Sequence, residues 1–185
     1  MRASRWYWCI GPTDPRALNT FVERPAIDAR LLFWLAALHG IDGMLYYQIN
    51  LWSQQCPTLR PCKSLERING TALTDFDART FAGGSTSVHP LTGGANGDGN
   101  LVYPGVRGPL ASNRLIAIAD GIEDWQLFHR LGLDTTSISH ADDLIAQLVR
   151  NMTDRTSDPR LLERVRREAA RRVVASERAA GVVEE

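Results

Sequence analysis

The chain has 185 residues, of which 44% are hydrophobic and 23% charged, a composition typical of a folded protein with one sizeable core. Its formal net charge is zero, so no overall field attracts nucleic acid or an anionic membrane. No apolar stretch reaches the roughly 20 residues that span a bilayer. The apolar run at 6–10 is also too short for a signal peptide. We therefore expect neither nucleic acid nor a membrane as a partner.

The first expected elements are a strand, a helix and a second strand. Residues 6–10 form an aromatic and apolar run that stops at Gly11-Pro12, as a short buried strand does. From about residue 26, apolar side chains recur at helical spacing, and His39-Gly40 supplies a C-terminal stop. Residues 44–52 are apolar on both faces, which is typical of a covered strand. The order strand, helix, strand predicts parallel pairing.

The two faces of the second strand differ in chemistry. One face is mainly apolar, and in a closed barrel we expect it to point towards the outer helices: Leu45, Tyr47, Ile49 and Leu51. The other face combines rings with amides, and we expect it to point into the lumen: Tyr46, Gln48, Asn50 and Trp52. Asn50 and Trp52 would then lie at the C-terminal mouth, where barrel enzymes keep their chemistry.

A long loop is expected over residues 53–100, which are rich in Gly, Thr, Ser and Pro and show little periodicity. The turn residues at 93–99 lack the partners of a phosphate loop or a calcium loop, so they predict a tight turn. Cys56 and Cys62 lie in this loop and can close a short disulfide in an oxidising compartment, but they match no zinc spacing. We expect no metal and no cofactor.

A third short strand, at 101–103, and three helices complete the expected elements. Ser112 is a plausible N-cap for a helix with one apolar stripe, formed by Leu115, Ile118, Ile122 and Trp125. Gly121 within that helix indicates either close backbone packing or a break. Further helices are expected at 141–151 and, starting at Asp158-Pro159, at 159–179. Arginines alternate with glutamates in the last helix, which indicates a solvated surface rather than a nucleic-acid arm.

Several motifs occur together in one order along the chain. They are an aromatic strand ending in Gly-Pro, ARLLxW at 29–34, DGMLYYxxNxW at 42–52, GDGxLVYPG at 97–105, SxRL at 112–115 and DGIEDW at 120–125. This set resembles the C-terminal part of the catalytic domain of family 123-type glycoside hydrolases, which are β-N-acetylgalactosaminidase-like, and of their uncharacterised relatives. The similarity covers residues 6–131.

The resemblance implies an α/β fold, namely the C-terminal portion of a (β/α)8 TIM-type barrel with about three parallel strands and flanking helices, followed by C-terminal helices. We expect a partial barrel over residues 1–135 and a helical extension over 136–185. A few barrel strands leave open sheet edges, so self-association through these edges is also expected.

The same resemblance implies activity on β-linked N-acetylhexosaminides by a retaining mechanism, in which the substrate's own acetamido group attacks the anomeric carbon. An adjacent Asp-Glu pair assists in the family, and we expect that pair to lie upstream of this chain. The chain alone would then be inactive. Glu123-Asp124 is interpreted instead as part of a structural ion pair with an arginine such as Arg114.

The expected role of this chain is therefore to bind carbohydrate. Rings stack on sugar faces and amides bond to hydroxyls, so the candidate substrate-binding residues are Trp8, Tyr46, Gln48, Asn50 and Trp52, with no catalytic residue among them. The alternative is a non-catalytic barrel remnant that binds sugar or protein. Two glycosylation sequons, at Asn69 and Asn151, would fit a secreted or lysosome-like parent protein.

Overall fold

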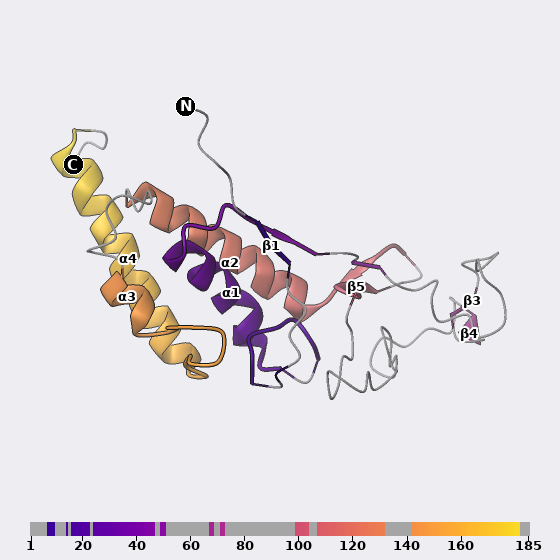
Figure 1. Ribbon diagram of the computed structural model, residues 1–185. Helices are drawn as coiled ribbons and strands as arrows, with labels where there is room; N and C mark the ends of the chain where they lie inside the picture. The colour runs from indigo at the N-terminus through magenta and orange to yellow at the C-terminus, as the bar shows by residue number, and fades with distance from the viewer. Residues whose placement is uncertain are drawn as a thin grey trace, which may run out of the picture.

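The computed structural model of the chain describes residues 7–9, 14, 16–22, 24–46, 49–50, 67–68, 71–72, 99–103, 107–131 and 142–181. Within these ranges, helices gather on one side of the molecule and short strands lie along and beyond them (Figure 1). The side chains of 7–9, 67–68, 71–72 and 142–143 lie outside the description.

Two parallel strands joined by a helix form the first unit. Strand β1 (Tyr7–Cys9) pairs in parallel with β2 (Gly43–Leu45), with Trp8 opposite Met44. Helix α1 (Ala26–Leu38) connects them, which is the crossover that a parallel pair requires. The helix ends at Leu38 with His39 as its C-cap, and Gly40 then takes a positive φ of 60°, a conformation that glycine adopts without penalty. The expected parallel pairing of the first two strands is confirmed.

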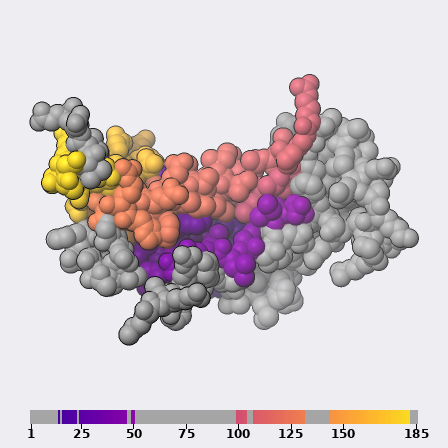
Figure 2. Space-filling model, turned by 90° about the horizontal axis from the view of Figure 1, so that it is seen from above, coloured from indigo at the N-terminus to yellow at the C-terminus, as the bar shows by residue number. Residues whose placement is uncertain are grey.

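The prediction that residues 101–103 form a third parallel strand is wrong within the described part of the chain. Strand β5 (Val102–Tyr103) pairs antiparallel with β6 (Leu110–Ala111), and Asn100 forms an antiparallel bridge with Asn50. Residues 101–103 therefore belong to a hairpin that precedes the next helix. The residues at 107–111 are exposed (Figure 2). A closed barrel remains a prediction.

Helix α2 (Asn113–Arg130) begins where its sequence indicated. The Ser112 hydroxyl accepts a hydrogen bond from the backbone N–H of Leu115, which caps the first turn. The helix packs along α1, and Gly121 lies close to Arg30 and Phe33 of that helix. A Cβ atom there would lie 2.9 Å from the carbonyl oxygen of Arg30 and 2.6 Å from Phe33 Cδ2. Close packing, and not a break, therefore explains this glycine.

The C-terminal helices complete the same core. Helix α3 (Asp142–Ala146) is short, and α4 (Pro159–Ala179) starts at Asp158, whose side chain accepts the N–H of Arg160. Helix α4 buries one narrow apolar stripe, formed by Leu162, Val165, Ala169 and Val173. Many of its charged side chains face solvent, as predicted, but Glu163 and Arg166 reach charged partners on α1 and α2. Leu162, Val165 and Ala169 join a cluster with Leu31, Trp34, Phe128 and Leu148 from the rest of the chain.

A small hairpin lies inside the segment expected to be a long loop. Strand β3 (Arg67–Ile68) pairs antiparallel with β4 (Thr71–Ala72). The other residues of 53–98, including Cys56 and Cys62, lie outside the described part of the chain. Among the helices of the described residues, none combines the length and the apolar character needed to cross a membrane.

Candidate functional site

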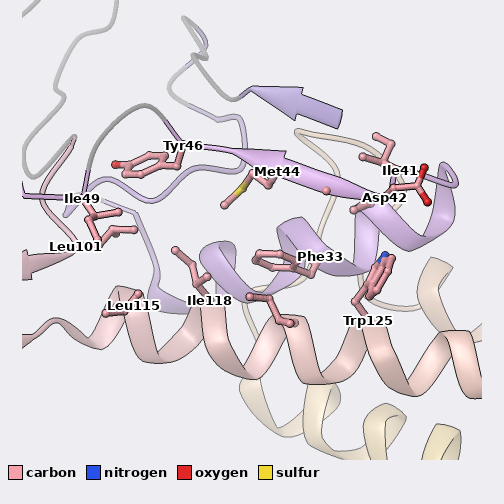
Figure 3. A pocket seen from close by; sticks show the side chains of 13 residues that line it. Phe33, Ile41, Asp42, Met44, Tyr46, Ile49, Leu101, Leu115, Ile118 and Trp125 are labelled. Carbon is pink, nitrogen blue, oxygen red and sulfur yellow. The ribbon is translucent and has the colours of Figure 1, made fainter. Parts of the chain in front are cut away.

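An apolar cavity of about 390 Å³ lies between β2, α1 and α2 (Figure 3). The predicted stripe of α2 forms one wall, with Leu115, Ile118 and Trp125 pointing towards β2. Ile122 from the same stripe also lines the cavity. Phe33 from α1 and Met44 from β2 close the space from the other sides. The stripe is confirmed as a single face, although Ile122 is still 41% exposed.

The orientation of β2 is opposite to the one expected. Met44 and Tyr46 pack against the helix side, on a cluster formed by Ala29, Leu101 and Ile118. Leu45, which was expected to face the helices, is 62% exposed. The expectation that Tyr46 faces a barrel lumen is therefore wrong here. Both faces of this strand are apolar, so the alternation of residues could not decide which face the helices cover.

A polar cluster lies at the end of β2. The Tyr46 hydroxyl accepts the backbone N–H of Gly99 at 2.9 Å and lies 3.3 Å from the Thr20 hydroxyl, which donates to it. Tyr46 thus ties together two segments that are far apart in the sequence. The backbone adds to this junction, because the N–H groups of Leu101 and Val102 both donate to the carbonyl of Ile49, at 2.8 and 3.0 Å.

Arg114 is the second tie in this cluster. Its buried guanidinium donates to the carbonyl of Thr20 at 2.7 Å, to the carbonyl of Asn100, and to the Tyr103 hydroxyl at 2.8 Å. A cation that donates to several fixed oxygens holds their segments rigidly. Arg114 therefore fixes the 19–20 and 99–103 segments against each other.

Of the five predicted binding residues, the structure describes the side chains of two. Tyr46 lines the cavity and enters the polar cluster, whereas Asn50 is exposed and bridges to Asn100 through its backbone. The side chains of Trp8, Gln48 and Trp52 lie outside the description, so their binding role stays a prediction.

Sequence reasoning missed the buried polar residues that surround Tyr46. They are Asn19, Thr20, Asn100 and Arg114, each less than a tenth exposed. Asn100 stands directly after the Gly97-Asp98-Gly99 turn, so its place in a motif was a signal that could have been used. Asn19 and Thr20 follow no motif, and only the folded chain reveals them.

Asp124 has a structural role, but with different partners from the one expected. Its fully buried carboxylate accepts hydrogen bonds from Arg30 at 2.6 Å, from Arg166 at 2.7 Å and from the Trp34 indole N–H at 2.8 Å. Arg114 does not contribute, since it binds the cluster described above. Glu123 is largely exposed and lies 3.7 Å from Arg166. Asp124 thus joins three helices, and neither Asp124 nor Glu123 is among the residues that line the cavity described above.

A second buried carboxylate connects α1 to the C-terminal region. Asp28 receives two hydrogen bonds from Arg155, at 2.8 and 3.2 Å. Burial raises the pKa of the Asp28 carboxyl above its ordinary value, and the neighbouring guanidinium of Arg155 opposes that rise. Among the described side chains, no three His, Cys, Asp or Glu residues come together as metal ligands would.

Comparison with known families identifies the chain. The model of the glycoside hydrolase 123 catalytic domain matches residues 1–131. The chain belongs to this family. The match spans β1 to α2 and therefore includes the cavity and the polar cluster, while α3 and α4 follow it. No curated protein matches this glycoside hydrolase 123 chain. The resemblance read from its motifs is confirmed.

Proposed function

We propose that this family member serves in the hydrolysis of β-linked N-acetylhexosaminides, with N-acetylgalactosamine as the preferred sugar. The match to the glycoside hydrolase 123 catalytic domain is the observation that carries the proposal, because it makes a carbohydrate the substrate. The described geometry adds a polar cluster, which contains the Arg114 guanidinium, beside an apolar cavity at the end of β2. Pyranose rings combine an apolar face with hydroxyl groups and suit such a surface.

The proposed chemistry is retaining and substrate-assisted. The oxygen of the 2-acetamido group attacks the anomeric carbon while a general acid protonates the departing oxygen, so no protein nucleophile is required. An acidic pair must face the substrate for this step. Asp124 does not meet that condition, because two arginines and an indole already occupy its carboxylate inside the helix packing. The catalytic pair is therefore not Glu123 and Asp124.

Binding tests the substrate class directly. We expect N-acetylgalactosamine to bind the purified chain more tightly than galactose does, as measured by isothermal titration, because the acetamido group is the feature that the proposed mechanism uses. A substitution of the exposed Asn50→Ala should weaken this binding, with Asn113→Ala on α2 as the matched exposed control. Equal affinity for the two sugars would contradict the proposed substrate class.

Hydrolysis tests the role of the acidic pair. Because neither Glu123 nor Asp124 lines the cavity, we expect no release of nitrophenol from nitrophenyl N-acetyl-β-galactosaminide by the chain alone, and no difference in the Glu123→Gln variant. Turnover that disappears in Glu123→Gln would instead assign this residue to catalysis. Sugar binding without turnover is also the result expected of a non-catalytic binding module, so the acetamido preference is the measurement that favours the hydrolase.

A further inference from the structure

Arginines form a continuous stripe along the outer face of α4, a helix at the edge of the helical part of the molecule (Figure 1). They recur at spacings of three, four and seven residues, which place side chains on one face of a helix: Arg160, Arg164, Arg167, Arg171 and Arg178. All of these residues are exposed, and the stripe is about 27 Å long. It lies opposite the apolar stripe that α4 buries in the core.

The glutamates of α4 lie beside the arginine stripe and are engaged by other partners. Glu163 binds an arginine of α1 at 3.1 Å, and Glu177 binds an arginine of α2 at 2.7 Å. Glu168 binds Arg172 at 3.2 Å and lies 3.7 Å from Arg171 of the stripe. The carboxylates of this helix therefore compensate little of the charge on its outer face.

The arginine stripe is a local concentration of positive charge on a chain whose formal net charge is zero. Among the described side chains, Arg160, Arg164 and Arg178 have no carboxylate partner. Arg167 donates to the backbone carbonyl of Glu163 at 3.3 Å, which leaves its charge uncompensated. Exposed cations in a row attract a linear polyanion, because its binding releases the counterions that both surfaces hold.

The composition of α4 favours an acidic glycan over the other polyanions. A membrane-binding helix inserts an apolar face, but the apolar face of α4 is buried in the core. Proteins that bind single-stranded nucleic acid stack its bases on aromatic rings, and α4 contains no Phe, Tyr, Trp or His. Sulfate and carboxylate groups need only charge and N–H donors, which guanidinium groups supply. The family also acts on carbohydrate.

We propose that the outer face of α4 binds a linear anionic glycan, whose sulfate or carboxylate groups pair with the arginine stripe. This surface lies beyond the family match, which ends at residue 131, and contributes no residue to the apolar cavity. It is thus an additional binding surface that holds a polymer beside the catalytic domain. Only the choice of an N-acetylgalactosamine polymer as the probe rests on the proposed function.

Salt dependence tests the electrostatic part of the inference. The probe is fluorescently labelled chondroitin sulfate, a sulfated polymer that contains β-linked N-acetylgalactosamine, and its binding to the full chain is followed by fluorescence anisotropy. We expect the affinity to fall about 100-fold between about 50 and 200 mM sodium chloride, because about five cations each contribute a slope of about −0.7. Absence of binding at the lower salt concentration would overturn the inference.

A triple substitution locates the binding on the stripe. Arg164→Gln, Arg167→Gln and Arg171→Gln together remove three neighbouring charges and keep good helix formers in place. We expect the affinity at low salt to fall at least tenfold and the salt slope to become shallower by about two. If this variant loses its thermal transition, Arg164→Gln alone replaces it, with an expected loss of about threefold; an unchanged affinity then overturns the inference.

The matched control removes the same charge from exposed positions outside α4, with Arg16→Gln, Arg107→Gln and Arg150→Gln combined. Its affinity should change less than about threefold, because solvent and salt screen distant charges. Equal losses in the two triple variants would overturn the inference, since net charge alone would then govern binding. A DNA duplex of equal charge that binds as tightly as chondroitin sulfate would also overturn it and assign the stripe to nucleic acid.

The outcomes separate this inference from the proposed function. If chondroitin sulfate binds through the stripe while free N-acetylgalactosamine does not bind the chain, the inference stands and the proposed substrate class is wrong. If free N-acetylgalactosamine binds but the stripe variant holds chondroitin sulfate as tightly as the wild-type chain, the proposed function stands and the inference is wrong.

Discussion

The carboxylate of Asp124 shows how one residue can determine the packing of three helices. Asp124 lies on α2, Arg30 and Trp34 lie on α1, and Arg166 lies on α4, so each of its hydrogen bonds crosses between elements. The carboxylate is fully buried, whereas Arg30 keeps 13% and Arg166 keeps 36% of the side chain exposed. The arginines can therefore reach solvent at their edges, while Asp124 depends entirely on its partners.

Replacing Asp124 should be far more damaging than replacing its neighbour Glu123. We expect Asp124→Asn to lower the free energy of unfolding by about 3 kcal/mol, because it removes the buried negative charge between Arg30 and Arg166 and leaves these arginines only their more exposed carboxylate partners. The exposed Glu123 lies 3.7 Å from Arg166, so Glu123→Gln should cost less than about 1 kcal/mol. Urea denaturation followed by circular dichroism measures both, and equal losses in the two variants would contradict the assignment.

The sequence could predict the type of interaction at this site but not the partner. Glu123-Asp124 lies inside a helix with arginines elsewhere in the chain, which indicated a structural ion pair, and that interpretation is confirmed for Asp124. Arg114 was named as an example of the partner, but it lies ten positions away in the same helix, which separates the two residues by about 15 Å along the helix axis. The actual partners come from α1 and α4. Their approach depends on how the helices cross, which local spacing does not encode.

Among the elements, helices were easier to predict than strands. The N-cap residues Ser112 and Asp158 and the stop at Gly40 are local signals, and all three are found at helix ends. Which face of β2 packs on the helices depends on α2, which is distant in the sequence. Because the strand is apolar on both faces, its own residues do not indicate which face is covered. The pairing of 101–103 was missed because β6 has only two residues and gives no periodic signal.

The contact between α1 and α2 makes a prediction about Gly121. At an ordinary helix position, replacing glycine with alanine stabilises a protein by up to about 1 kcal/mol. Here the added methyl group would meet the Arg30 carbonyl at 2.9 Å, and backbone yields less readily than a side chain. We therefore expect Gly121→Ala to lower the free energy of unfolding by about 1–3 kcal/mol.

The exposed residue Ala119 on the same helix provides the control for this prediction. Ala119→Gly should cost about 1 kcal/mol through helix propensity alone, without any packing effect. Thermal unfolding followed by circular dichroism measures both variants. A Gly121→Ala chain more stable than wild type would show that α1 and α2 can move apart at no cost.

At the scale of the whole molecule, the core extends beyond the region that the family shares. The family match ends at Leu131, yet Leu144, Ile145 and Leu148 from the following segment are buried with Trp34 and Phe128. Two arginines from this segment also satisfy buried carboxylates of the matched region, since Arg155 binds Asp28 and Arg166 binds Asp124. Apolar contacts and ion pairs thus connect the two regions that were expected to divide at residue 135.

A shortened chain tests this dependence. We expect a chain that ends at Leu131 to lose its cooperative thermal transition, because α1 and α2 would expose their shared apolar surface and leave Asp28 and Asp124 without these arginines. Circular dichroism against temperature provides the measurement. A chain that ends at Gly181 keeps α4 and is the control, with an expected Tm equal to that of the full chain. A cooperative transition in the shorter chain at a similar Tm would show that the matched region is self-sufficient.

The apolar cavity between β2 and α2 offers a binding site for apolar dyes in the native state. Its wall of Phe33, Met44, Ile118 and Trp125 is open enough to leave Ile122 partly exposed. Amphiphilic dyes such as anilinonaphthalene sulfonate become fluorescent in apolar surroundings and are commonly taken to report unfolding. We expect the native chain to bind such a dye in this cavity, so the dye would fluoresce before the protein unfolds. Its fluorescence would therefore start from a high baseline and decline on heating, the reverse of the usual signal.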